Sequence, residues 1–216
     1  MFPAGQQDVH EFFWNGIFNK IQDEINPKEK AKKIEGWDSM KSWKWYTLYY
    51  RDILNMLFGG QYEGNVVCKS CKNVSRTYDP FLEISLPADV STLVEGLDTE
   101  FKKTTLPKST GYKCEKCKKV TSIIQYTRID KPPKYLIIHL KRLAGVRTKI
   151  SRFIKFPSVL DISGYCVKER SLNYKLHAVC VHSGGATGGH FYAAGKRGDK
   201  VLLRLHISGT YSMILL

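Results

Sequence analysis

The sequence has no apolar run long enough to cross a membrane, since its longest candidate is the segment 135–140. The first residues lack the basic-then-apolar pattern of a signal peptide. The sequence also shows no internal repeat and no low-complexity tract. These absences argue against a helical membrane protein, a repeat array and a disordered segment, and we expect no membrane partner.

Acidic residues are few relative to basic ones. The chain has 216 residues, with 34 Lys and Arg against 20 Asp and Glu, for a net charge of +14. Its 43% hydrophobic and 25% charged residues are ordinary for one globular domain with a real core. A basic excess can favour nucleic acid or another anionic partner. The lysines are scattered over 28–33, 113–119 and 141–155, which favours a solvated basic surface and leaves nucleic-acid binding supported by net charge alone.

Four of the six cysteines form two C-x-x-C pairs, Cys68 with Cys71 and Cys114 with Cys117. One such pair could be a redox site, but two pairs complete the closed set of four thiolates that structural Zn²⁺ favours. A closed site leaves no position for water, so the ion would stabilise the fold rather than catalyse a reaction. The sequence therefore predicts one structural Zn²⁺ site.

Apolar residues recur with the spacing of a helix near the N-terminus, whereas after residue 64 they recur at close to every second position. Helices are predicted at 8–25, 46–58 and 91–101, with a surface loop at 27–44. Strands are predicted at 75–86, 122–128, 135–140, 152–156, 174–182, 191–194 and 201–206. Two helices followed by many strands and one small helix predict an α+β fold.

A glycine-rich loop separates two of the predicted strands. Residues 177–192 read HAVCVHSGGATGGHFY, so that His182 ends one strand and His190 begins the next. Glycines allow a substrate backbone to approach closely, and a histidine at the end of the loop can act as a general base. A structural histidine after an ordinary turn would give the same pattern, and the residues alone do not separate the two.

Several segments in order resemble the catalytic domain of the ubiquitin-specific proteases, cysteine hydrolases that release ubiquitin from its conjugates. The matching segments are QQDVHEF at 6–12, the two C-x-x-C pairs, YDPFL at 78–82, PPKYLIIHLKR at 132–142, FIKFP at 153–157, YKLHAV at 174–179, HSGG at 182–185 and GGHFY at 188–192. No single segment is specific, but their order and combination make chance implausible.

The resemblance implies a papain-like fold of the ubiquitin-specific protease type. It implies a partial thumb at 1–58, zinc-binding fingers at 59–128 and a β-rich palm with the histidine box at 129–216. It assigns His190 as the general base and implies ubiquitin and ubiquitinated proteins as partners. The residues that it places along the ubiquitin C-terminal tail are Gln7, Asp8, Ser183, Gly184, Gly185, Gly188 and Gly189.

The chain departs from the family pattern at both ends. The family's nucleophilic cysteine lies well upstream of the QQD segment, whereas this chain has only five residues before Gln6. Cys166 and Cys180 are interpreted as structural thiols. No WYxFxD segment follows His190, and Asp199 is the only nearby acid that could orient it. We therefore expect the 216-residue chain alone to be inactive.

Three functions remain open at this point. The first is a deubiquitinating thiol hydrolase that is incomplete in this chain, and the second is a ubiquitin-binding pseudo-protease. The third is a basic zinc-ribbon protein that binds nucleic acid, although no compact basic and aromatic motif supports it. Cysteines gathered at a metal site fit a reducing environment, so we expect an intracellular protein of the cytoplasm, the nucleus or both.

Overall fold

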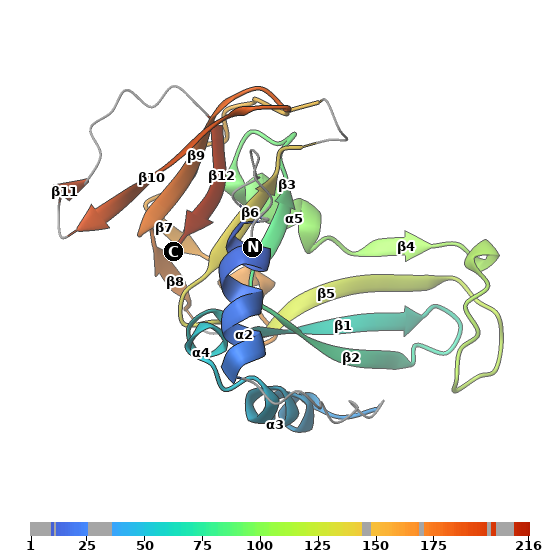
Figure 1. Cartoon of the computed structure of the whole chain (residues 1–216). Coiled ribbons are helices and arrows are strands. Elements are labelled where there is room, and N and C mark those ends of the chain that lie inside the picture. The colour runs from blue at the N-terminus through green and yellow to red at the C-terminus, as the bar shows by residue number, and fades with distance from the viewer. Residues whose placement is uncertain are drawn as a thin grey trace.

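The computed structural model describes residues 10, 12–25, 36–143, 148–168, 171–197, 200–201 and 210–216. Two sheets dominate it (Figure 1). The finger sheet has the strand order β2-β1-β5-β4 and projects to the right in Figure 1. The palm sheet has the order β11-β10-β9-β12-β6-β3 and lies at the upper left. The predicted α+β class is confirmed.

The helices and strands have the following residue ranges, grouped by sheet. The helices are the π-helix η1 (Phe12–Phe18), α2 (Asn19–Ile25), α3 (Ser39–Tyr49), α4 (Ile53–Phe58), α5 (Leu93–Glu100) and the 3₁₀ turns η2 (Lys108–Thr110) and η3 (Ser163–Tyr165). The finger strands are β1 (Gly60–Cys68), β2 (Val74–Phe81), β4 (Thr104–Leu106) and β5 (Ile123–Lys131). The palm strands are β3 (Ile84–Pro87), β6 (Ile137–Lys141), β9 (Ala178–Gly184), β10 (Gly189–Arg197), β11 (Lys200–Val201) and β12 (Thr210–Leu215). A small separate sheet pairs β7 (Val159–Asp161) with β8 (Asn173–Lys175). No helix in these ranges is long and apolar enough to cross a membrane.

The first helix is confirmed over 12–25, but its first part is a π-helix rather than an α-helix. Phe13 and Phe18 are five residues apart, and their ring centroids are 4.9 Å apart. A π-helix bonds residues five apart, so it can bring both rings onto the face that packs on the palm sheet. Trp14 joins the same cluster, with its centroid 4.6 Å from that of Phe18.

The predicted single helix over 46–58 is wrong, and the loop predicted at 27–44 is wrong over 39–44, while residues 27–35 lie outside the described part of the chain. The structure has α3 and α4, and each begins at an aspartate whose side chain accepts a backbone N–H three residues on, Asp38 from Lys41 and Asp52 from Asn55. Such capping favours two short helices over one long helix. Asp52 and Asn55 are buried, and Tyr46 donates a hydrogen bond to the Asn55 side chain.

Two of the predicted strands each divide between two sheets. The segment 75–86 gives β2 at the edge of the finger sheet and β3 in the palm sheet. An edge position tolerates Pro80, which cannot donate a ladder hydrogen bond. The segment 174–182 likewise gives β8 and β9. The predicted strand at 152–156 is not formed, because Lys155 makes only an isolated bridge with Thr92.

The palm sheet contains residues from distant parts of the chain. Strand β3, within the expected finger range 59–128, runs parallel to β6, so this boundary does not separate the two sheets cleanly. Strand β12 pairs with both β6 and β9, a position that the sequence analysis did not predict. The expected strand at 201–206 lies mostly outside the described residues. Both neighbours of β12 are palm strands, so β12 is central to this sheet.

Successive residues of the palm strands face opposite layers. Ile138 belongs to the main core, whereas Ile137 packs with Phe18 and Met213 beneath η1. Helix α5 covers the main core with Leu93 and Leu97, both fully buried. A cap begins this helix, since the Thr92 hydroxyl accepts from the Glu95 backbone N–H at 3.1 Å.

We predict that Leu97→Ala lowers the free energy of unfolding by about 2–5 kcal/mol, since it leaves a cavity in a closed core. Urea unfolding followed by circular dichroism measures the change. Val94 lies on the same helix and is 43% exposed. Val94→Ala should therefore change stability by only about 0.5 kcal/mol. Equal losses for the two variants would contradict this account of the core.

Candidate functional site

The four cysteines of the two C-x-x-C pairs meet at the far end of the finger sheet. Their sulfurs all lie within 4.8 Å of one another. Cys68 Sγ is 3.9 Å from Cys117 Sγ, and Cys71 Sγ is 3.7 Å from Cys114 Sγ. A tetrahedron with metal–sulfur bonds of about 2.3 Å has sulfurs about 3.8 Å apart, so the cluster fits a Zn²⁺ ion.

The backbone folds in the same way around both pairs. Lys72 and Lys118 follow the two turns with φ values of 59° and 58°. Their N–H groups donate to the carbonyls of Cys68 at 2.9 Å and Cys114 at 2.8 Å. The Cys71 N–H lies 3.4 Å from Cys68 Sγ and lowers the pKa of this thiol to about 6. Backbone donors of this kind favour the thiolate form that binds a metal.

His190 is the second residue of β10 and lies far along the sequence from the N-terminal helix η1. It is exposed and pairs across the ladder with Ser183 of β9. Its side chain makes no hydrogen bond or ion pair to the parts of the chain that the structure describes. The imidazole is therefore positioned by its strand and is open to a reacting group from outside these residues.

The loop before His190 requires glycine at two positions. Gly184 has φ +130°, which strains other residues, and a Cβ there would lie 2.4 Å from the Gly189 Cα. A Cβ at Gly189 would lie 2.3 Å from His182 Nε2. The loop thus closes tightly on itself, and Gly185 and Gly188 complete its backbone between the two strands. Ser183 and Gly184, predicted to belong to the loop, are instead the last residues of β9, and Gly189 is the first residue of β10.

His182 has the structural role expected for it. It is buried, and its ring stacks on Phe191 with centroids 4.3 Å apart. Its carbonyl accepts a hydrogen bond from the Thr210 hydroxyl at 3.4 Å, which joins β9 to β12. Of the two histidines in the HSGG and GGHFY segments, only His190 is exposed.

Several predicted site residues lie outside the described part of the chain. These are Gln7, Asp8 and Asp199. The remaining cysteines are described. Cys166 is buried, and its Sγ donates to the Ile162 carbonyl at 3.4 Å. Cys180 pairs with Ala193 on β10, three positions from the His190–Ser183 pair, so its side chain faces the opposite side of the sheet from His190.

A second cluster, which the sequence did not predict, links the start of the N-terminal helix to the palm sheet. It consists of His10, Trp14, Glu83 and His139. His10 Nε2 lies 2.9 Å from Glu83 Oε1, and the His10 and His139 rings stack with centroids 3.9 Å apart. Trp14 Nε1 donates to Glu83 Oε2 at 2.9 Å. Burial opposes ionisation of Glu83, but the hydrogen bond and charge of His10 hold its pKa below the usual range. Since 73 residues separate His10 from Glu83, no local spacing predicts this cluster.

Comparison with known proteins identifies relatives along most of the chain. Residues 2–203 match the family model of the ubiquitin carboxyl-terminal hydrolases. Ubiquitin carboxyl-terminal hydrolase Usp2 of Drosophila melanogaster is 31% identical over 203 residues, which are 87% of this chain and 22% of that protein. Ubiquitin carboxyl-terminal hydrolase 8 of Saccharomyces cerevisiae is 33% identical over 206 residues, which are 87% of this chain and 42% of that protein. This chain therefore spans less than half the length of either relative.

Solved structures agree with the sequence relatives. The SAGA DUB module, Ubp8 with Sgf11, Sus1 and Sgf73, bound to monoubiquitin, matches with a TM-score of 0.76 and 28% identity over 97% of this chain and 48% of the matched chain. The Ubp8 module bound to ubiquitin aldehyde matches with a TM-score of 0.75 and 26% identity, covering 97% of this chain and 49% of that chain. The expected ubiquitin-specific protease fold is confirmed, and the chain belongs to the ubiquitin carboxyl-terminal hydrolase family, whose members are cysteine peptidases.

Proposed function

We propose that this chain forms the fingers and palm of a deubiquitinating thiol hydrolase, which cleaves isopeptide or peptide bonds after the C-terminal glycine of ubiquitin. The observation that carries the proposal is the exposed His190 at the exit of a tight glycine loop, in a chain of this family. The relatives named above are ubiquitin carboxyl-terminal hydrolases, and two of the similar structures hold ubiquitin or ubiquitin aldehyde.

In the proposed reaction His190 removes the proton of a cysteine thiol, and the thiolate attacks the carbonyl carbon of the terminal glycine of ubiquitin. His190 then gives the proton to the leaving amine, and water hydrolyses the thioester in a second step. Ser183, Gly184, Gly185, Gly188 and Gly189 would lie along the ubiquitin tail. Gln7 and Asp8 would bind the same tail, where a carboxylate can accept hydrogen bonds from its backbone or its arginines.

We propose that none of the six cysteines of this chain serves as the nucleophile. Four form the finger cluster, Cys166 is buried, and Cys180 faces the opposite side of the palm sheet from His190. We propose that the chain alone does not hydrolyse ubiquitin conjugates and that the thiol, with an Asp or Asn to orient His190, must be supplied by other residues.

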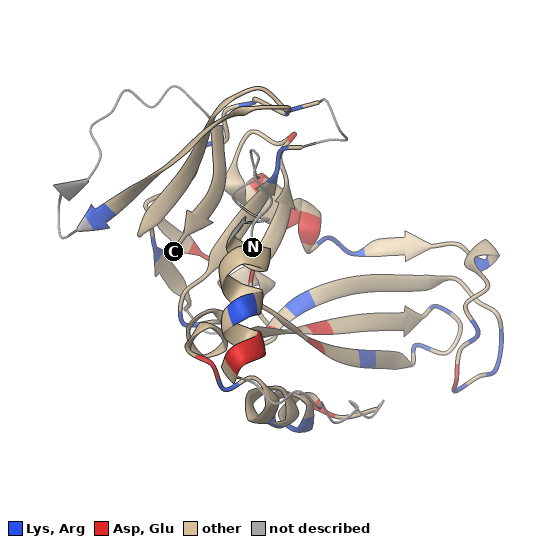
Figure 2. Cartoon of the chain, in the orientation of Figure 1, with Lys and Arg blue, Asp and Glu red and all other residues tan. Residues whose placement is uncertain are grey.

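A ubiquitin-binding pseudo-protease is the second candidate, favoured by the same absence of a thiol beside His190. Fingers and palm without a nucleophile could still bind ubiquitin. A nucleic-acid-binding protein has weaker support, because Figure 2 shows the Lys and Arg residues of the described segments distributed over both sheets and the finger loops.

We also propose that Cys68, Cys71, Cys114 and Cys117 bind one structural Zn²⁺, on the basis of the sulfur spacing and the two equivalent turns. The ion would hold the tips of β1 and β5 together. Six cysteines, four of them assigned to this site, fit a reducing compartment, and we propose an intracellular location in the cytoplasm, the nucleus or both.

Metal analysis of the purified chain should give one Zn²⁺ per molecule, and Cys68→Ser with Cys71→Ser should abolish binding. The double substitution removes two of four ligands, so the melting temperature should fall to that of chelator-treated protein. Cys180→Ser is the matched control and should retain the metal. Retention of zinc by the double variant, or a wild-type melting temperature unchanged by chelation, would contradict the proposal.

A ubiquitin–fluorophore substrate should show no turnover with the chain alone, and a ubiquitin-based cysteine trap should label neither Cys166 nor Cys180. A second protein would add two segments of the Drosophila relative to this chain: the segment with the nucleophilic cysteine, upstream of QQD, and the strand that follows the catalytic histidine. This fusion should be active. In that fusion, His190→Ala should reduce turnover by at least ~10²–10⁴-fold, because proton transfer depends on this imidazole.

The control for this loss is His177→Ala, because His177 is also exposed but lies at the other end of β9 from the loop. It should leave turnover near the wild-type value. Ubiquitin binding, measured by titration of labelled ubiquitin, should persist in both variants. An active His190→Ala fusion would show that His190 is not the base. Ubiquitin binding by an inactive fusion would instead favour the pseudo-protease.

A further inference from the structure

Arg142 carries a buried positive charge directly after β6. The residue is 4% exposed. Its Nη1 donates to the carbonyls of Ile150 and Arg152, both at 2.9 Å, and its Nε donates to the carbonyl of Tyr211. Its Nη2 is buried with no hydrogen-bond partner, and no described carboxylate lies within ion-pair distance. Burial lowers the pKa of Arg142 to about 10, which reflects the cost of holding this charge away from water.

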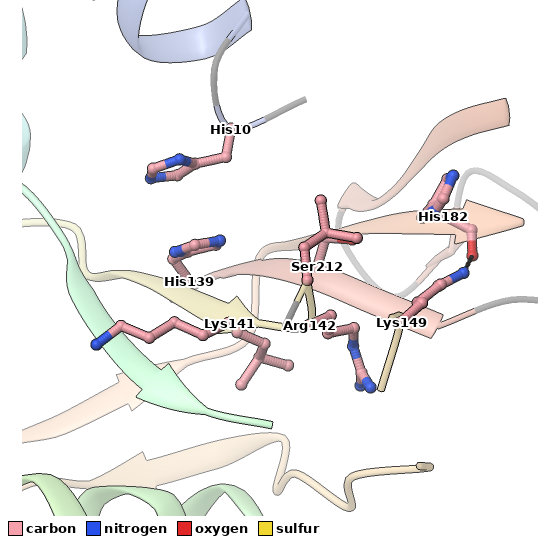
Figure 3. Close-up of a pocket in the computed structure, with 9 residues that line it drawn as sticks. His10, His139, Lys141, Arg142, Lys149, His182 and Ser212 are labelled. Atoms are coloured by element: carbon pink, nitrogen blue, oxygen red, sulfur yellow. Dashed lines mark hydrogen bonds between the residues drawn. The ribbon is translucent and has the colours of Figure 1, made fainter. Parts of the chain in front are cut away.

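A cavity of about 210 Å³ lies beside this guanidinium (Figure 3). Three cationic side chains and three imidazoles contribute to its lining, and no acidic side chain does. These residues are Lys141, Arg142, Lys149, His10, His139 and His182. The charged side chains of the wall are therefore all cationic, and its other polar groups are the three imidazoles and Ser212. A positively charged concave site raises the local concentration of anions.

Lys149 brings a second cation close to Arg142. Its Nζ donates to the carbonyl of Gly184 at 2.7 Å and to that of His182 at 3.3 Å. Burial, and then the charge of Arg142, lower the pKa of Lys149. Two like charges with only carbonyl dipoles to stabilise them favour an anion between or beside them, since charged hydrogen bonds to an oxyanion are strong.

The cavity does not suit a cation. His10, Glu83 and His139 place ligand atoms within 4.8 Å of one another, as a metal would require. The two imidazoles are nearly parallel, however, at 12°, so their lone pairs do not converge on one point between the rings. The Glu83 oxygens already accept from Trp14 and Ser85, and the neighbouring Lys141, Arg142 and Lys149 would repel a cation.

We propose that this cavity is a binding site for one small inorganic oxyanion of the phosphate or sulfate class, held by Arg142 and Lys149. The free Nη2 of Arg142 supplies a donor that nothing else satisfies, and a buried unpaired polar group is where an ion or ordered water is expected. Because Lys149 also contacts Gly184, a bound anion would connect the segment after β6 to the start of the glycine loop.

The test uses the zinc-loaded 216-residue chain titrated with sodium phosphate, or with sodium sulfate, against sodium chloride at constant ionic strength. The Arg142 Nε–Hε signal in a ¹⁵N correlation spectrum should shift along a saturable, single-site curve with either oxyanion and should move little with chloride. Saturation distinguishes binding from the general stabilisation that sulfate gives to many proteins. A shift that grows linearly to high concentration, or no shift, would overturn the proposal.

Lys149→Gln should weaken the fitted affinity at least tenfold, because it removes one of the two charges while an amide can still donate to a loop carbonyl. Lys149→Arg should keep most of the affinity. The matched control is Lys175→Gln, an exposed lysine on β8. Equal affinity in Lys149→Gln and Lys175→Gln would place the anion elsewhere and refute the site. If Lys149→Gln fails to fold, the titration of the wild-type chain alone tests whether the anion binds beside Arg142.

Discussion

Strand β12 lies between β6 and β9, and its backbone pairing connects the two halves of the palm sheet. Without it the hairpin of β9 and β10, which carries His190, would have no ladder to β6 and β3. Leu216 extends this connection, since its N–H donates to the Leu136 carbonyl at 2.9 Å and its carbonyl accepts from the Leu136 N–H at the same distance. The position of His190 therefore depends on the pairing of residues 210–216.

The finger sheet is attached to the rest of the molecule at its base by a buried polar network. Asp130 accepts from Ser39 at 2.6 Å and from Gln61 at 2.8 Å, and it pairs with Lys131 at 3.0 Å. Burial opposes its ionisation, but these partners hold the pKa of Asp130 below its usual range. The cysteine cluster lies at the opposite end of β1 and β5. The two ends of the fingers are thus stabilised by different chemistry, hydrogen bonds at the base and thiolates at the tip.

Sequence patterns predicted what depends on neighbouring residues. The C-x-x-C spacing predicted the cysteine cluster because each pair lies within one turn, and the glycines around His190 predicted a tight loop. Patterns failed where distant segments decide the outcome. The cap at Asp38 lies in a charged stretch that reads as a loop, so α3 was missed. The place of β12 depends on β6 and β9, and the environment of Arg142 depends on carbonyls from Ile150, Arg152 and Tyr211. The assignment of His190 came from family resemblance, because a strand-edge histidine has no distinguishing local pattern.

The central position of β12 has a consequence for how the protein is made. The ladders of β1 with β2 and of β3 with β6 join segments that are complete by residue 141. These pairs can therefore form while the chain is still being synthesised. The palm sheet, in contrast, remains open between β6 and β9 until residues 210–215 have left the ribosome. During that interval the edges of β6 and β9 are unpaired, and unpaired edges are the surfaces on which chains associate wrongly. Until β12 pairs with both strands, the nascent chain therefore exposes two strand edges on which it can aggregate.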